Sequence, residues 1–324
     1  METVDRHNML SVLNSFPSQL EEASKLGLGM RFERIRKIAV CGMGGSAIAG
    51  EALKAYMREL PVEIIKGYEV PPYLPKETLA FAVSHSGNTE ETISCYNELV
   101  KRGIPTVAIC SGGKLAELSA KSAQVLLPEG AKGIMPRHAT LYMLMPMLNI
   151  LQNSGLIRLD DTKPISEALK DPGLHQQARQ IAEGISSTPL FYASDRNSFA
   201  AKVWKISFNE NAKMAAFWNE IPEMQHNEVV GLANSGPEFT AVLLKDSNDH
   251  PRVKERFRIL EKLIEGRIKC ITYEMKGATR LEMIVLTIYM AHLAGYYKAI
   301  SMGIDPTPVE IIERLKKELE TLRS

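Results

Sequence analysis

Residues 84–92 read Ser-His-Ser-Gly-Asn-Thr-Glu-Glu-Thr, and they follow directly after the apolar run LAFAV at 79–83. A second apolar run, IAVC at 38–41, leads in the same way into Gly-Met-Gly-Gly-Ser at 42–46. An apolar run, a loop rich in glycine and hydroxyl groups, and then a helical pattern are typical of a parallel α/β sheet. Ligands bind such sheets beyond the carboxyl ends of the strands. The repeated loop therefore predicts both the fold class and the place of a binding site.

Alternating strand and helix patterns extend along the chain on both sides of these loops. In the first half we expect strands at 37–42, 61–65, 78–83, 106–110 and 124–127, with helices at 46–58, 88–101 and 114–121. In the second half we expect strands at 189–193, 239–244 and 270–273, with helices at 196–211, 250–264, 278–299 and 309–322. The fold class is therefore α/β, with two doubly wound parallel-sheet subdomains, each flanked by helices.

The polar stretch 160–172 is expected to connect the two subdomains, which we place at 1–155 and 156–324. Residues 1–35 read as one amphipathic helix and a turn. The last helix carries an apolar side, which predicts that it packs on the body of the protein. That side consists of Val309, Ile312, Leu315 and Leu319.

Composition excludes several classes of protein. The chain has 324 residues, is 45% hydrophobic, and carries 39 basic against 38 acidic residues, so we expect neither nucleic acid nor a membrane as a partner. The four cysteines form no CxxC pair, and the seven histidines form no pair at metal-ligand spacing. We expect no metal site, reduced buried cysteines, and a cytoplasmic protein without a signal peptide.

The two loops have the composition of a phosphate site. Helix N-termini offer unpaired amides and a partial positive charge, which favour an anion. Gly44 and Gly45 would allow close backbone approach to the ligand. Hydroxyl donors would come from Ser46, Ser84, Ser86 and Thr89. Asn88 and Thr89 are also common helix caps, so a purely structural role is the alternative for these two residues.

A nucleotide site fits these loops poorly. Residues 42–47 satisfy the GxGxx(G/A) pattern of dinucleotide-binding folds, but the second strand ends in Lys66-Gly67-Tyr68 rather than in an acidic residue. The phosphate-loop pattern GxxxxGK(S/T) is absent. We therefore expect no nicotinamide or nucleotide cofactor.

Glu210 is the best candidate for a catalytic base. Ala200, Val203 and Ile206 form an apolar stripe on the predicted helix 196–211, and the same stripe continues to Glu210. A carboxylate on an inward face is unusual unless it is paired or used. The negative end of the helix also disfavours its charge, which suits a group that must take up a proton near neutral pH. A salt bridge to Lys205 or Lys213 is the structural alternative.

Arg137 is the best candidate for a cation beside a developing negative charge. It stands in Met-Pro-Arg-His at 135–138, between the first sheet and a Met-rich helical segment. A guanidinium can donate several hydrogen bonds to an oxyanion. A solvent-exposed arginine at a helix start is the alternative. His138 is adjacent, and we assign it no role.

The chain resembles the sugar-isomerase (SIS) fold in the segments GMGGSAIAG at 42–50 and SHSGNTEET at 84–92. More narrowly, it resembles the archaeal-type bifunctional phosphoglucose/phosphomannose isomerases. Two further segments strengthen the narrower resemblance: NENAK at 209–213 and PEMQHNE at 222–228. The resemblance covers nearly the whole chain and includes both predicted subdomains.

This resemblance implies an aldose–ketose isomerase that needs no cofactor and acts on sugar phosphates. Glucose 6-phosphate, fructose 6-phosphate and mannose 6-phosphate would exchange through a cis-enediolate. Glu210 would move the proton between C1 and C2, and Arg137 would stabilise the enediolate. His226, contributed by the other subunit of a homodimer, would help to open the sugar ring together with Lys316. Lys317 is adjacent to Lys316, and the choice between the two lysines stays open.

Two other functions remain as alternatives. A regulatory SIS protein would bind a phosphosugar without turnover, but residues 1–35 are too few for a helix-turn-helix domain. The isomerase half of an amidotransferase would need a glutamine-hydrolysing partner, and the chain has no N-terminal cysteine nucleophile.

Overall fold

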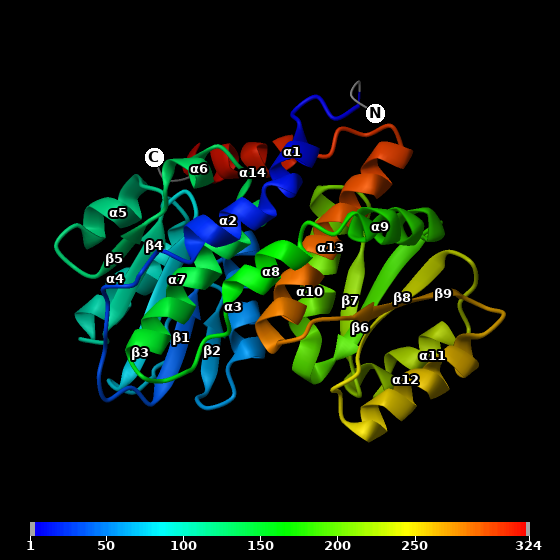
Figure 1. The fold of residues 1–324 in the computed structure, drawn as a ribbon, viewed down its shortest axis with the longest axis horizontal. Helices are drawn as coiled ribbons and strands as arrows, with labels where there is room; N and C mark the ends of the chain where they lie inside the picture. The colour runs from blue at the N-terminus through cyan, green and yellow to red at the C-terminus, as the bar shows by residue number, and fades with distance from the viewer. Residues whose placement is uncertain (1–3, 322–324) are drawn as a thin grey trace.

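The computed structural model describes residues 4–321 and contains two parallel β-sheets that lie side by side (Figure 1). Sheet A has five strands in the order β2-β1-β3-β4-β5. Its strands are β1 (Lys37–Cys41), β2 (Val62–Ile65), β3 (Thr78–Ser84), β4 (Thr106–Cys110) and β5 (Gln124–Leu126). Every residue of β3 and β4 is buried, as expected for central strands of a sheet covered on both faces. The five strands predicted for the first half are all confirmed.

Sheet B has four strands in the order β7-β6-β8-β9. Its strands are β6 (Thr188–Ser194), β7 (Phe217–Ile221), β8 (Phe239–Asp246) and β9 (Lys269–Met275). The edge strand β7 was not predicted, because its sequence FWNEI is short and ends in polar residues before Ile221. The two parallel sheets confirm the predicted fold class.

Helices cover the faces of both sheets and fill the space between them. The helices that follow strands of sheet A are α3 (Gly44–Tyr56), α4 (Glu90–Lys101), α5 (Gly113–Ser119) and α6 (Glu129–Lys132). After β5 the chain continues through η1 (Pro136–His138) into α7 (Thr140–Asn153). The helices associated with sheet B are η2 (Asp195–Asn197), α10 (Ser198–Glu210), η3 (Glu223–His226), α11 (Glu228–Leu232) and α12 (Pro251–Ile264).

The helix α13 (Arg280–Ser301) is the central support of the molecule. It packs against α10, α3 and α9 (Pro172–Gly184), so it contacts elements of both halves. It is the one helix among residues 4–321 that is long and apolar enough to cross a membrane, but 89% of its most apolar stretch is buried inside the protein. Its apolar character therefore serves the core.

Two parts of the chain differ from the prediction. The N-terminal region has two helices, α1 (Met9–Asn14) and α2 (Phe16–Ala23), rather than one. The polar stretch 160–172 contains α8 (Thr162–Ala168), which packs on α2 through a hydrogen bond from Ser166 Oγ to Glu21 Oε1 at 2.9 Å. The stretch is thus a helical part of the packed body rather than an open connection.

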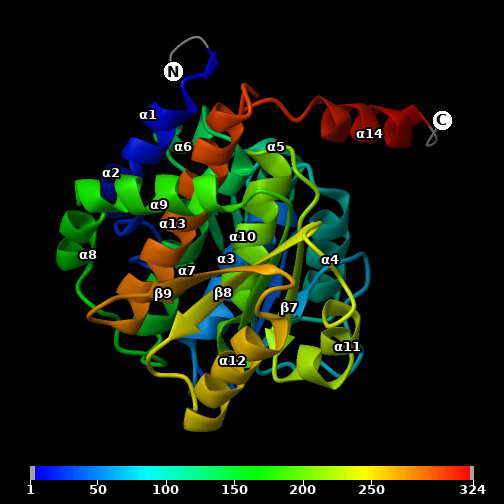
Figure 2. The same ribbon diagram turned by 90° about the vertical axis from the view of Figure 1, so that its right-hand side faces the viewer.

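The C-terminal helix α14 (Glu310–Thr321) is present, but the prediction that it packs on the body of the chain is wrong. Leu315 is 59% exposed and Leu319 is 46% exposed. Figure 2 shows that α14 projects beyond the rest of the protein. The helix is amphipathic, as predicted, but Leu315 and Leu319 on its apolar side are not covered by the described part of the chain.

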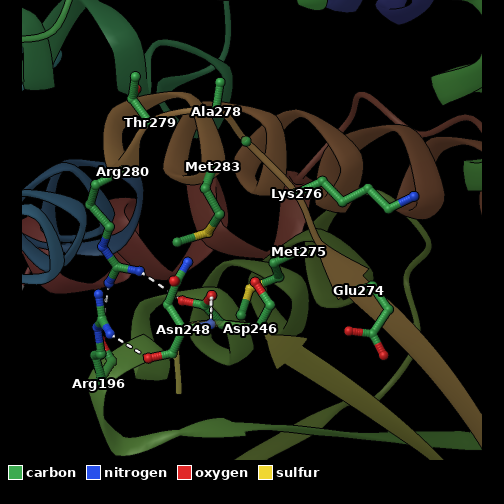
Figure 3. A pocket seen from close by; sticks show the side chains of 12 residues that line it. Arg196, Asp246, Asn248, Glu274, Met275, Lys276, Ala278, Thr279, Arg280 and Met283 are labelled. Carbon is green, nitrogen blue, oxygen red and sulfur yellow. Dashed lines mark hydrogen bonds and ion pairs between the residues drawn. The ribbon is translucent and has the colours of Figure 1, made fainter. Parts of the chain in front are cut away.

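A cavity at the carboxyl edge of sheet B contains an arginine that joins the two halves of the protein (Figure 3). Arg280 pairs with Asp246 through Nη1 and Oδ2 at 3.2 Å, and Asp246 is only 3% exposed. The same guanidinium donates to the carbonyl of Ala55 at the end of α3, at 3.1 and 3.2 Å. The hydrogen-bond donors of Arg280 therefore join sheet B and α13 to the first subdomain.

Replacement of Arg280 should therefore destabilise the fold. Arg280→Ala leaves the Asp246 carboxylate buried without its cation, and we expect a loss of about 3 kcal/mol in the free energy of unfolding, measured by urea titration. The exposed pair Lys114–Glu117 provides a matched control, because Lys114→Ala should cost less than about 1 kcal/mol. A loss of equal size in both variants would contradict the conclusion that the partly buried contacts of Arg280 stabilise the fold.

Candidate active site

The loop between β3 and α4 is held in shape by its own side chains. Ser84 is fully buried, donates to Thr89 Oγ1 at 2.9 Å, and accepts from the amide of Gly87 at 3.1 Å. Gly87 has φ +74°, and a Cβ there would lie 1.8 Å from the carbonyl oxygen of Gly112. Only glycine fits at this contact between neighbouring loops. Ser84 thus shapes the loop from within, whereas the prediction gave it a direct contact with phosphate.

Ser86 and Thr89 are the hydroxyls of this loop that face outward. Ser86 is exposed and Thr89 is half-buried. Asn88 lies between them, and its Oδ1 accepts from the amide of Lys114 at 2.9 Å, so it binds the next loop rather than its own helix. The side chain of Thr89, the cap residue of α4, makes no hydrogen bond to the amides of the first turn.

The first glycine-rich loop lies beside this one. Ser46 Oγ accepts from the amide of His85 at 3.3 Å and contacts Met143 Sδ at 3.3 Å. Gly44 is exposed, has φ +51°, and has open space where a Cβ would point. Helix α3, like α4, has no side-chain cap on its first amides. The N-termini of α3 and α4 therefore present amides and hydroxyls to one place, as an anion site requires.

Gly45 lies between this candidate anion site and Arg137. A Cβ at Gly45 would lie 2.7 Å from the carbonyl oxygen of Pro136 and 2.8 Å from Cα of Arg137. The absence of a side chain lets η1 lie directly against the start of α3. Close approach between two backbones, rather than approach to a ligand, is therefore the observed reason for glycine at 45.

Arg137 lies at the centre of the candidate site, with a side chain that is 1% exposed. Its Nη1 lies 3.2 Å from Glu210 Oε2, and its Nε donates to Asn211 Oδ1 at 2.7 Å. Its Nη2 donates to the carbonyls of Pro306 and Thr307 at 3.2 and 2.9 Å. Burial lowers the pKa of the Arg137 guanidinium, and the Glu210 carboxylate opposes that shift. The arginine is held by the protein on several sides and pairs with one carboxylate.

Glu210 comes from the other half of the molecule. It is the last residue of α10, and its side chain is 24% exposed, so it can be reached from solvent while it contacts Arg137. Helix α10 runs back from the carboxyl end of β6, so Glu210 lies at the amino edge of sheet B. The carboxyl edge of sheet A and the amino edge of sheet B therefore meet at this ion pair.

A buried polar network packs against the Arg137–Glu210 pair on the side away from solvent. Asn211 is fully buried, and its Nδ2 donates to Ser207 Oγ at 3.1 Å. Ser207 Oγ lies 3.3 Å from His292 Nδ1, and the His292 ring stacks edge-on with His138, with 4.9 Å between ring centroids. Burial lowers the pKa of His292 to about 3 and that of His138 well below its usual value. Burial thus favours the neutral form of both imidazoles, which pack against each other behind the ion pair.

Lys213 is a site residue that sequence analysis considered only as a possible salt-bridge partner. It has φ +57°, which is uncommon for lysine, and its Nζ donates to the carbonyls of Glu210 and Pro306. Partial burial and then the charge of Arg137 lower the pKa of Lys213 to about 8. The sequence feature that could have identified Lys213 is its position three residues after Glu210. No sequence feature could have identified the carbonyls of Pro306 and Thr307, because every residue has a backbone carbonyl.

His226 does not reach this site within the same chain. It is exposed at the end of η3, just after the carboxyl end of β7. Glu210 precedes the amino end of the same strand, and five strand residues span about 16 Å. The two side chains therefore lie at opposite edges of sheet B.

The two candidate lysines of α14 also lie outside the ion-pair centre. Lys316 is 62% exposed and pairs with Glu313 at 2.8 Å. Lys317 lines a cavity beside Met135 and Thr307, at the point where α14 leaves the body. Of the two, Lys317 is the one that faces the body of the protein.

Family models match both halves of the chain. Residues 32–145 match the SIS domain, and residues 174–319 match the C-terminal SIS domain of bacterial phospho-glucose isomerase. A solved structure of glucosamine-6-phosphate deaminase from Thermotoga maritima superposes with a TM-score of 0.69 at 20% identity and covers 91% of this chain and 96% of its own. At that identity the superposition shows the shared fold.

Curated relatives extend the similarity over most of the chain. The bifunctional phosphoglucose/phosphomannose isomerase of Aquifex aeolicus is 36% identical over 87% of this chain and 90% of its own length. The protein of the same name from Caldicellulosiruptor bescii is 30% identical over 97% and 100%. The D-glucosamine-6-phosphate 4-epimerase of Sulfolobus acidocaldarius is 34% identical over 88% and 90%. Full-length similarity to enzymes favours an isomerase over a regulatory SIS protein, and the chain belongs to the bifunctional phosphoglucose/phosphomannose isomerase family.

Proposed function

We propose that this protein interconverts glucose 6-phosphate and mannose 6-phosphate with fructose 6-phosphate by proton transfer through a cis-enediolate. The observation that carries the proposal is the Arg137–Glu210 pair at 3.2 Å, which Gly45 brings against the helix N-termini of the hydroxyl-rich loops. A sugar phosphate held by its phosphate at these loops extends its C1 and C2 toward the pair. The arrangement places an anion site for the phosphate next to a base and a cation for the reacting carbons.

Each group then has a role that its surroundings support. The amides of Gly44 and Gly45 and the hydroxyls of Ser86 and Thr89 bind the phosphate, with Ser46 and Ser84 holding the two loops in place. Glu210 takes the proton from one carbon and returns it to the next. Arg137 stabilises the negative charge that forms on the sugar oxygen, because it is fixed in a site with little access to water.

Mannose 6-phosphate needs no additional base. The enediolate has lost the configuration at C2, so return of the proton to either face gives glucose 6-phosphate or mannose 6-phosphate. The same Glu210 serves both reactions if the intermediate can present both faces to it.

Ring opening uses groups that the single chain does not bring to the Arg137–Glu210 pair. We assign one of these groups to His226 of a second copy in a homodimer, because His226 is exposed at the opposite edge of sheet B from its own Glu210. Lys316 was the predicted second group, and the cavity beside Thr307 favours Lys317 instead.

The direct experiment is incubation of the purified protein with fructose 6-phosphate in D₂O that contains EDTA. We expect glucose 6-phosphate and mannose 6-phosphate with deuterium at C2, detected by NMR. Absence of both products would refute the proposal, and products without deuterium would refute exchange of the proton with solvent. Glucosamine 6-phosphate belongs in a parallel reaction, because epimerisation at C4 would place the protein with its Sulfolobus relative instead.

Glu210→Gln should abolish turnover and leave binding nearly intact. We expect kcat to fall at least about 1000-fold, because the amide cannot accept the proton. The affinity for fructose 6-phosphate, measured by isothermal titration calorimetry, should stay within about tenfold, because most binding is made at the phosphate. Glu117→Gln, at a carboxylate that is 69% exposed, is the control and should leave both quantities unchanged. An equal loss of binding and rate would make Glu210 structural.

Asn211→Ala should loosen Arg137 and reduce the rate. The change leaves Arg137 Nε without its acceptor, and we expect a loss of about 2 kcal/mol in the free energy of unfolding together with a fall in kcat. Asn211→Asp keeps the acceptor and should recover more of kcat than of stability, which a purely structural role would not produce. Urea titration and steady-state kinetics on both variants measure the two effects.

Complementation between inactive chains tests the contribution of a second copy. Glu210→Gln and His226→Ala should each be inactive alone, but a mixed dimer contains one intact site. Equal mixtures after subunit exchange should recover about a quarter of the wild-type activity, because half of the dimers are mixed and one of their two sites is complete. No recovery, despite mixed dimers shown by native mass spectrometry, would place His226 outside the active site.

A further inference from the structure

Each sheet has one place where the order of its strands changes direction. In sheet A this place lies between β1 and β3, because the chain leaves β1 toward β2 on one side and leaves β3 toward β4 on the other. In sheet B it lies between β6 and β8, which are flanked in the same way by β7 and β9. Open parallel sheets bind ligands beyond the carboxyl ends of the two strands at such a place. The glycine- and hydroxyl-rich loops have this position in sheet A, and the equivalent position in sheet B takes no part in the proposed reaction.

A cavity of about 530 Å³ lies at this position in sheet B (Figure 3). Its lining comes from the loops that follow β6, β8 and β9 and from the start of α13. Arg196 follows β6, Lys276 follows β9, and Arg280 begins α13. Figure 3 shows the side chains of Arg196 and Arg280 next to each other, and Arg280 Nη2 lies 3.4 Å from the carbonyl oxygen of Arg196. Two guanidiniums therefore lie together at one end of this cavity.

A second cavity, of about 540 Å³, adjoins the first and adds two more arginines. Arg196 and Arg280 line both cavities. Arg58, which follows α3, and Arg158, which follows α7, line the second cavity as well. We call these four residues the arginine cluster. Two members come from each half of the chain, so segments far apart in sequence contribute arginines to one cavity.

The charge of the arginine cluster is not balanced by the carboxylates beside it. Only Glu59 and Asp160 among residues 4–321 line the second cavity as carboxylates, and each accepts a hydrogen bond from a backbone amide, at 3.0 and 3.4 Å. Within the same described residues, Arg280 is the one member of the cluster that forms an ion pair, with Asp246. The other three guanidiniums line the cavity without a carboxylate partner. Such a lining favours an anionic ligand.

Arg196 also carries a hydrogen-bond donor that the protein does not use. Its Nη1 donates to the carbonyl of Asn248 at 2.8 Å, but its Nε is buried and has no partner in the described part of the chain. Buried donors without an acceptor are rare in native proteins and call for a missing partner. Burial, and then the charge of Arg196, lower the pKa of Arg280 to about 10. An anion among these guanidiniums would supply acceptors and offset their repulsion.

We propose that the arginine cluster binds the phosphate group of a small metabolite, at a second anion site separate from the loops of sheet A. Phosphate has the charge and the acceptor oxygens that guanidiniums recognise best. Arg58 and Arg158 are exposed and Arg196 is half-buried, so the ligand can enter from solvent. A phosphate held by all four arginines contacts both halves of the chain, and its binding stabilises the folded protein.

The test is calorimetric titration with inorganic phosphate at constant ionic strength, with fructose 6-phosphate in a parallel series. The background is Ser86→Ala/Thr89→Ala, which removes hydroxyl donors from the proposed first site. We expect this background to keep a phosphate site, and Arg58→Ala/Arg158→Ala within it to weaken that site at least about tenfold, because charge-assisted hydrogen bonds are lost. Equal affinity for the two probes would show that phosphate alone is recognised. Tighter binding of fructose 6-phosphate would show that the sugar contributes as well.

A matched control removes two exposed cations elsewhere. Lys25→Ala/Arg31→Ala takes away the same charge from residues that line neither cavity, and it should leave the phosphate affinity unchanged. Arg196→Ala, checked for folding by circular dichroism, should weaken binding as the Arg58/Arg158 variant does. Equal weakening in the control would overturn the proposal, because general surface charge would then explain the binding.

Two further outcomes would overturn the proposal. One is absence of phosphate binding in the Ser86/Thr89 background, and the other is binding that neither arginine variant weakens. Isomerisation is measured separately and does not depend on this site. Arg58→Ala/Arg158→Ala in the otherwise wild-type chain should therefore keep full turnover of fructose 6-phosphate, so failure of the second site leaves the proposed function standing.

Discussion

The architecture depends on one ion pair between two subdomains, in which the arginine is buried and the carboxylate is partly exposed. Arg137 follows the last strand of sheet A, and Glu210 ends the helix that follows the first strand of sheet B. A buried arginine is costly unless its donors are used, and here a carboxylate, an amide and two carbonyls accept them. The two sheets, α13 and the segment at 306–307 must all be in place for these contacts to form. The requirement to satisfy one guanidinium therefore couples the packing of the two halves to the geometry of the candidate active site.

The central part of the fold was predictable from sequence because its strands are buried on both faces. Runs such as LAFAV at 79–83 and VAIC at 107–110 have no polar residue to suggest another structure, and the loops that follow them carry glycine where backbones touch. The position of Glu210 was predictable for a related reason. A carboxylate on the apolar stripe of α10 is an exception to the pattern around it, and the exception lies at the candidate site.

Other features were not predictable because they depend on three-dimensional contacts that a sequence pattern does not show. Strand β7 has a mixed sequence, and its identity depends on pairing with β6. Ser84 and Ser86 are alike in sequence, but one is buried and shapes the loop while the other faces outward. For α14 the amphipathic pattern predicts a packed face, but a pattern does not state whether the packing surface belongs to the same chain. For β7 the deciding contact is made by residues distant in sequence, whereas for Ser84 it depends on how the loop turns back on itself.

The bonds from Arg137 to the carbonyls of Pro306 and Thr307 have a consequence for synthesis of the protein on the ribosome. Arg137 leaves the exit tunnel long before these two carbonyls exist, because sheet B and α13 are translated in between. The guanidinium therefore gains these two acceptors only after sheet B and α13 have been translated. The full set of contacts around Arg137 depends on residues about 170 positions further along the chain, so it cannot form while only the first sheet has been made.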